Sequence, residues 1–130
     1  MKFQKKTTQI ILNNNLGKSE NLKYLIESLL DYGYSIEQKD EEYGTVNTDI
    51  RPLKGLNVSY FLTARAKDNQ IILTGKFIIN LSVRIGQVET KPSFSDITNK
   101  GMKGSANNKS FATMYEYASR LDFSNIEFGL

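Results

Sequence analysis

The stretch VSYFLTARAKDNQIILTGKFII, residues 58–79, contains two apolar alternations joined by a short polar turn. Even-numbered positions from Val58 to Ala66 and odd-numbered positions from Ile71 onward hold the apolar side chains, and Gly75 interrupts the second run. A period of two with one apolar face is typical of β-strands. The KDNQ turn therefore predicts an antiparallel pair, and Gly75 predicts a bulge or bend in its second strand.

Residues 19–32, upstream of this pair, carry apolar side chains at the period of an α-helix. Ser19 is the expected N-cap and Gly33 the expected C-terminal stop. The pattern predicts one buried face and one polar face. The apolar face comprises Leu22, Leu25, Ile26, Leu29 and Leu30, and the polar face comprises Glu20, Asn21, Lys23, Glu27 and Ser28.

Residues 110–121 repeat the helical spacing, with Ser110 as the expected N-cap. Between the two helical segments, residues 86–109 hold Pro92, glycines and many small polar residues. This composition predicts at most one short strand and then a mobile loop. The tail, residues 122–130, is expected to pack back as an edge. The apolar stripe of the helix predicted over residues 110–121 comprises Phe111, Met114, Ala118 and Leu121.

Shorter alternating runs at residues 7–12, 34–37 and 46–50 predict further strands. The resulting order is β-α-β-β-β-α. Two apolar helix faces need a sheet surface to cover, which favours a two-layer arrangement. We therefore expect a single α+β domain over residues 1–130, with a curved antiparallel sheet of four or five strands and two helices on one face.

The composition excludes several classes of site. The chain has 130 residues, with 17 basic and 14 acidic side chains, no cysteine and no histidine. Disulfides, thiolate metal sites and a Ser-His-Asp triad therefore cannot form within the chain. Carboxylate chemistry and an oxygen-ligated cation stay open, but the sequence singles out no cofactor, no metal site and no catalytic residue.

No run of 18 apolar residues occurs, so we expect no transmembrane segment. The first residues, MKFQKKTTQIILNNN, are basic like the start of a signal peptide, but the apolar core at residues 10–12 is too short for one. If a signal peptide upstream of residue 1 has been cleaved off, the expected location is the periplasm or cell envelope. If the protein is made without a signal peptide, the expected location is the cytoplasm.

The stretch KDEEYGTVNTDI, residues 39–50, groups the carboxylates Asp40, Glu41, Glu42 and Asp49. Its spacing does not match a calcium loop, and consecutive residues of a strand point to opposite faces. The pattern indicates a polar hairpin turn, with Gly44 at a position of positive φ. A catalytic carboxylate pair is the alternative, drawn from Glu37, Glu42, Asp49 and Glu89.

The stretch NKGMKGSANNKS, residues 99–110, is the best candidate for an anion loop. Lys100, Lys103 and Lys109 surround two glycines just before the second predicted helix. Free backbone N–H groups at a helix start favour an anion, but the phosphate-loop pattern is absent. The alternative is a flexible basic surface loop.

The sheet face opposite the core stripe is the second candidate surface. It would mix apolar, cationic and hydroxyl side chains, which suits a platform for a protein partner or small ligand. Stacking of single-stranded nucleic acid is a further use of such a face. The alternative is that the tail or a second copy of the chain covers it. The candidate binding residues are Phe61, Arg65, Lys76, Ile78 and Arg84, with Ser59, Thr63, Ile72 and Asn80 beside them.

Three segments, LLDYGYSI (29–36), DEEYGTVNT (40–48) and GMKGSANNKSFATMYEYASRL (101–121), together resemble a known group of proteins. The pattern is similar to small domains of unknown function in secreted and lipoprotein-type envelope proteins of Bacteroidota. Those domains have a sheet-and-helix layout like half of a TATA-binding protein. The resemblance implies the same layout and an extracytoplasmic home, and it implies no catalytic residue.

These observations favour a non-catalytic binding or interaction module of the bacterial cell envelope that uses the helix-free sheet face. A small cytoplasmic protein that binds nucleic acid or an anion is the alternative. A carboxylate-dependent enzyme is the third hypothesis.

Overall fold

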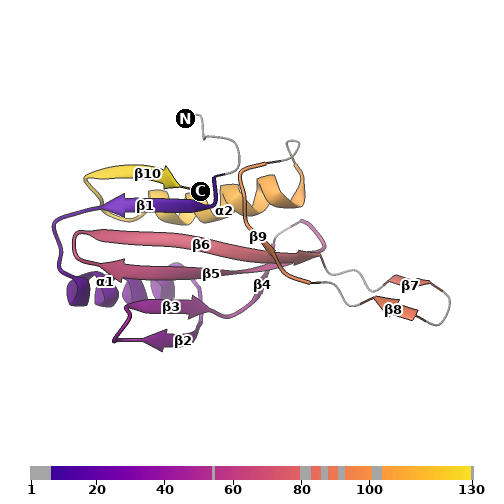
Figure 1. The fold of residues 1–130 in the computed structure, drawn as a ribbon, viewed down its shortest axis with the longest axis horizontal. Helices are drawn as coiled ribbons and strands as arrows, with labels where there is room; N and C mark the ends of the chain where they lie inside the picture. Colours follow the sequence, from indigo (N-terminus) through magenta and orange to yellow (C-terminus); the bar gives the residue numbers. More distant parts are fainter. Residues whose placement is uncertain are drawn as a thin grey trace.

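The computed structural model describes residues 7–53, 55–79, 83–85, 88–90, 93–100 and 104–129. This part of the chain forms two helices and an open antiparallel sheet, which confirms the mixed α and β content (Figure 1). The helices are α1 (Lys18–Asp31) and α2 (Ala106–Ser119), and the strands are β1 (Gln9–Asn13), β2 (Ile36–Asp40), β3 (Thr45–Thr48), β4 (Arg51–Pro52), β5 (Val58–Lys67), β6 (Gln70–Ile79), β7 (Val83–Ile85), β8 (Val88–Thr90), β9 (Ser95–Asp96) and β10 (Asn125–Gly129).

The described sheet has eight strands, so the expectation of four or five is wrong. Six strands follow the order β10-β1-β6-β5-β3-β2, while β4 pairs with β5 and β9 pairs with β6. Strands β4 and β9 have two residues each, which is too short to produce an alternating pattern. Strands β7 and β8 form a separate two-stranded ribbon beyond the end of the β5–β6 pair (Figure 1).

Strands β5 and β6 form the predicted antiparallel pair, in unbroken register from Val58↔Ile79 to Lys67↔Gln70. The expected bulge at Gly75 is wrong, because Gly75 pairs directly with Leu62. A Cβ atom on Gly75 would lie 2.6 Å from Ile97 Cδ1. The same Cβ atom would lie 3.0 Å from the backbone oxygen of Phe61, so close packing favours glycine at this position, and the expected bend stays a prediction.

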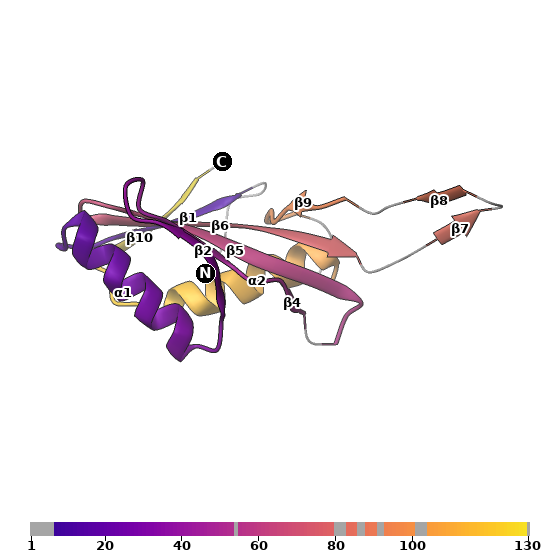
Figure 2. The ribbon, with the colours of Figure 1, turned by 90° about the horizontal axis from the view of Figure 1, so that it is seen from below.

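Both helices cover the same face of the sheet (Figure 2). The predicted inward residues of β5 are all buried, as are the four apolar residues predicted for α2. Two predicted core residues are exposed, Leu30 at 53% and Ile79, the last residue of β6, at 42%, and a third, Ile26, is half-buried. The common core thus lies between the two helices and the central strands.

Helix α1 begins one residue before the predicted N-cap, so the assignment of Ser19 to that role is wrong. Gly17 is the N-cap, and the carboxylate Oδ1 of Asp68 accepts a hydrogen bond of 2.8 Å from Lys18 N. Asp68 lies in the turn between β5 and β6. A distant residue therefore provides an acceptor for one of the first N–H groups of the helix, which have no partner within it. Gly33, with φ +100, follows the end of the helix as predicted.

Asn21 departs most from its predicted position on the polar face of α1, because it is completely buried. Its amide Nδ2 donates to the backbone oxygens of Lys67 (2.8 Å) and Leu16 (3.2 Å). Asn14 Nδ2 donates in turn to Asn21 Oδ1 (2.7 Å). The backbone N–H of Asn69, whose φ is 64°, donates to Leu16 O (2.7 Å). These bonds join the β5–β6 turn to the first turn of α1.

Helix α2 begins four residues before the predicted start, and Ser110 is a buried helix residue rather than the cap. The N-cap is Ser105, whose hydroxyl accepts a hydrogen bond of 3.2 Å from Asn108 N. Within residues 86–109 the structure contains β8, β9 and the first turn of α2, so the expectation of at most one strand is wrong. The predicted mobility of this segment stays a prediction.

The C-terminal tail packs back as predicted. Residues Asn125–Gly129 form β10, an edge strand that pairs with β1 throughout its length. Its half-buried side chains, Ile126 and Phe128, pack against the core.

We predict that Asn21→Ala lowers the free energy of unfolding by about 2 kcal/mol or more, because it removes the side-chain donor to Lys67 O and the acceptor of Asn14 Nδ2 from a buried position. Asn15→Ala is the matched control, since Asn15 is an exposed asparagine of the neighbouring loop, and its effect should stay within about 0.5 kcal/mol. Equilibrium urea unfolding measures both values. Equal losses in the two variants would contradict a specific role for Asn21.

Candidate functional site

The helix-free face of the sheet is polar across its middle. Thr63 Oγ1 donates to Asn47 Oδ1 (2.8 Å), and Thr74 Oγ1 donates to the backbone oxygen of Thr63 (3.4 Å). Nearer the β5–β6 turn, Gln70 Nε2 donates to Asn13 Oδ1 (3.2 Å). These groups satisfy one another within the sheet, so this part offers a partner few free hydrogen-bonding groups.

One end of the same face is apolar. Phe61 and Phe94 pack edge to face, with ring centroids 5.4 Å apart. Ile50 is 57% exposed and Phe94 is 40% exposed, although both are large apolar residues. An open groove of about 630 Å³ runs along them, and we call it the Phe61 groove; it is lined by Glu37, Thr48, Asp49, Ile50, Phe61 and Phe94.

The predicted platform residues lie as follows. Phe61 pairs with Lys76 across β5 and β6, and Ile78 pairs with Ser59 one step further along the same face. Lys76 Nζ lies 3.7 Å from Asp96 Oδ1, so its charge is balanced locally. Arg65 is exposed on this face, four residues or about 13 Å along β5 from Phe61.

Other predicted site residues are only partly described. Arg84 lies in β7, but its side chain is outside the described residues, as is the whole of Lys103. Lys100 is exposed in the segment after β9, and Lys109 lies in the first turn of α2 rather than in a loop. The anion-loop hypothesis therefore stays a prediction.

The acidic stretch forms the predicted polar turn between β2 and β3. Asp40 Oδ1 accepts a hydrogen bond of 3.0 Å from Tyr43 N, and Gly44 has a φ of +70°. The side chain of Glu89, one of the carboxylates considered for catalysis, lies outside the described residues. Of the three that are described, only Glu37 and Asp49 line a common groove, the Phe61 groove. Among the described residues, no three acidic side chains are grouped so that they could hold a metal ion.

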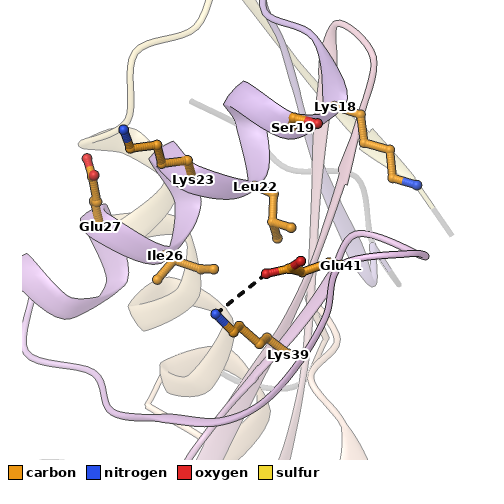
Figure 3. Close-up of a pocket in the computed structure, with 8 residues that line it drawn as sticks. All are labelled: Lys18, Ser19, Leu22, Lys23, Ile26, Glu27, Lys39 and Glu41. Atoms are coloured by element: carbon orange, nitrogen blue, oxygen red, sulfur yellow. Dashed lines mark ion pairs between the residues drawn. The ribbon is translucent and has the colours of Figure 1, made fainter.

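A second groove, about 530 Å³ in volume, lies between α1 and the β2–β3 hairpin. Figure 3 shows Leu22 and Ile26 pointing from the helix toward Lys39 and Glu41. The ion pair between Lys39 Nζ and Glu41 Oε1 spans 3.8 Å, and Lys18 Nζ donates to the backbone oxygen of Glu42. Lys39, Glu41 and Lys18 therefore already have partners, and Lys23 and Glu27 line the groove as two further charged residues. No sequence pattern predicted this groove.

Strand β2, beside this groove, is an edge of the sheet. Its register with β3 shifts between Ile36 and Gln38, which marks a bulge or irregularity. Lys39 pairs with the buried Val46 and so lies on the helix-covered side. An irregular edge strand with an inward-facing lysine is protected against pairing with another strand. This edge is therefore a poor place for a partner to add a strand.

A cluster of tyrosines lies inside the protein on the helix side. The hydroxyl groups of Tyr34 and Tyr60 share a hydrogen bond of 2.9 Å, and the hydroxyl of Tyr117 shares one of 2.8 Å with Ser28 Oγ. Burial raises the pKa of all three tyrosines, and the bond to Tyr60 raises the pKa of Tyr34 further. These hydroxyl groups therefore stay neutral well above their usual titration range.

A scan against protein-family models finds none that matches the chain, and a search of curated proteins finds no matching relative. In the described part of the chain, neither helix has the length and apolar character needed to cross a membrane.

We predict that the protein loses stability as the pH rises above about 10, where tyrosines of the unfolded chain ionise. The raised pKa values keep Tyr34, Tyr60 and Tyr117 protonated in the folded state, so the unfolded state binds fewer protons. Each should reduce the free energy of unfolding by up to about 1.4 kcal/mol per pH unit in this range. Urea unfolding at increasing pH measures the slope, and tyrosinate absorbance reports ionisation.

Tyr34→Phe should make this alkaline slope shallower. Tyr43→Phe is the control, because Tyr43 is 61% exposed and should leave the slope unchanged. Ionisation of all seven tyrosines before unfolding would contradict the prediction.

Proposed function

We propose that this protein is a non-catalytic binding module, and that the Phe61 groove on its helix-free sheet face receives a segment of a protein partner. The observation that carries the proposal is the exposure of Ile50 and Phe94 beside Phe61 at one end of this face. Large apolar side chains grouped around an open groove favour association, because docking removes them from water.

The charges of the groove specify the partner more closely. Glu37 and Asp49 line it, and none of the described lysines or arginines does. A partner segment that places an apolar side chain against Phe61 and Phe94 would therefore gain from a neighbouring Lys or Arg. We propose a polypeptide segment of this mixed apolar and basic character as the ligand.

Three features weigh against nucleic acid as the ligand of this face. Lys76 is already paired with Asp96, and the edge-to-face contact of Phe61 with Phe94 covers one ring face on which a base could otherwise stack. The acidic rim of the groove would also repel phosphate groups. The cationic Arg65 lies at a distance from the groove, in the polar part of the face.

An envelope setting is part of the proposal and rests on the sequence resemblance. A periplasmic or surface location fits a module that binds protein segments rather than performing chemistry.

The binding proposal predicts that selection from a random peptide library enriches sequences with Lys or Arg next to an aromatic or branched aliphatic residue. Ile50→Ser and Phe94→Ser should weaken binding of such a peptide at least about tenfold, because each removes apolar contact area. Glu37→Gln combined with Asp49→Asn should weaken it less and reduce its salt dependence. Fluorescence polarisation with a labelled peptide measures the affinities.

Leu30→Ser is the matched control, because Leu30 is an equally exposed apolar residue on α1, at 53%. Enriched peptides that bind wild type, Ile50→Ser and Phe94→Ser equally would disprove the site. Tighter binding of a single-stranded oligonucleotide, lost on Arg65→Ala, would favour the nucleic-acid alternative instead.

The envelope setting predicts that the protein, tagged at its C-terminus and expressed from its native gene in the source bacterium, fractionates with the periplasm or envelope. A cytosolic enzyme and a known periplasmic protein serve as markers. Recovery in the cytosol alone would remove the envelope part of the proposal and leave the peptide-binding part standing.

A further inference from the structure

Arg51 of β4 lies on the helix-covered side of the sheet, away from the Phe61 groove. Its guanidinium carbon lies 4.3 Å from the centroid of the Tyr34 ring, a cation–π arrangement. Its Nη1 atom is buried beside Gly33 and has no hydrogen-bond partner among the described residues. A guanidinium packed in this way is fixed in position by an aromatic face rather than by an acidic side chain.

The charge of Arg51 is not balanced by a carboxylate in the described part of the chain. The ion pairs found there join other residues. Glu116 lines the same region but pairs with Arg120 at 3.9 Å. Because a partly buried cation without a counter-ion is unfavourable, this arrangement favours an anion brought by a ligand.

Arg51 lines an open groove of about 420 Å³ between β4, β5 and α2, a volume within the range of small-ligand sites. Lys109, from the first turn of α2, lines the same groove and adds a second cation. Tyr34 and Tyr60, which are buried and whose hydroxyls are hydrogen-bonded to each other, also line it. In such a pair one hydroxyl donates to the other, and the accepting hydroxyl keeps its own hydrogen to donate elsewhere.

We propose that this groove binds a small oxyanion, a carboxylate or phosphate group, held by the guanidinium of Arg51, the ammonium of Lys109 and the remaining hydroxyl hydrogen of the Tyr34–Tyr60 pair. A guanidinium presents two parallel N–H donors that match the oxygens of either group. The raised pKa values of both tyrosines keep that hydrogen in place over the physiological pH range. The site shares no side chain with the Phe61 groove and does not depend on the proposed peptide binding.

The test is a titration of the full chain with inorganic phosphate and, separately, with acetate, at neutral pH and constant ionic strength set with sodium chloride. Nuclear magnetic resonance follows the Nε–Hε signal of Arg51 and the ring signals of the tyrosines. We expect a saturable shift of these signals with one or both anions. Saturation by phosphate alone assigns a phosphate ligand, and saturation by acetate alone assigns a carboxylate.

Three single substitutions distinguish a loss of anion binding from a loss of folded structure. Arg51→Met keeps an unbranched chain over the Tyr34 ring but removes the charge, and it should weaken anion binding at least about tenfold. Lys109→Gln should weaken it by about two- to fivefold, because Lys109 is exposed. Arg65→Gln makes the same charge change as Arg51→Met on the opposite face and should leave binding unchanged.

The absence of any saturable shift with either anion would overturn the proposal, as would equal loss of binding in Arg65→Gln and Lys109→Gln. If Arg51→Met does not fold, the Arg51 signal of the wild type and the comparison of Lys109→Gln with Arg65→Gln still decide the question.

Discussion

The antiparallel pairing of β5 with β6 is the constraint on which the rest of the structure depends. The two strands stay in register over ten consecutive residue pairs, and each buries alternate side chains under the helices. A slip of one residue in either strand would turn its whole apolar set toward solvent. The register therefore determines both the core and the helix-free face. Every other strand of the main sheet is placed by pairing outward from this ladder.

The ladder is coupled to α1 by polar contacts rather than by apolar packing alone. Asp68 accepts from the first N–H group of the helix, and Asn21 reaches back from the helix to the carbonyl of Lys67. Each bond satisfies a backbone group that would otherwise lack a partner at a helix start or a strand end. The β5–β6 turn consequently fixes where α1 begins. The start of the helix is therefore held from a distant turn, while its N-cap, Gly17, offers no side-chain acceptor.

The periodic parts of the fold could be predicted from the sequence because burial of one face imposes a repeat. The alternation in β5 and the stripe of α2 are confirmed for this reason. Features that depend on partners distant in the chain could not be predicted. In the sequence Asn21 has the character of a solvent-facing residue, because its contact with Lys67 exists only in the folded protein. Gly75 likewise suggests a bulge, because the sequence does not show that Ile97 packs against it. The two-residue strands β4 and β9 are too short for any period.

The same limit applies to the candidate sites. Phe61 could be placed on the helix-free face by alternation, but its neighbours Ile50 and Phe94 come from segments whose position depends on β4 and β9. No sequence pattern predicted a site at Arg51, because the feature that distinguishes this residue is its contact with the Tyr34 ring in the folded protein. Tyr60 and Phe61 are consecutive in β5 and therefore point to opposite faces. The two proposed sites share this backbone but no side chain, so a change in one groove can be made without removing any group from the other.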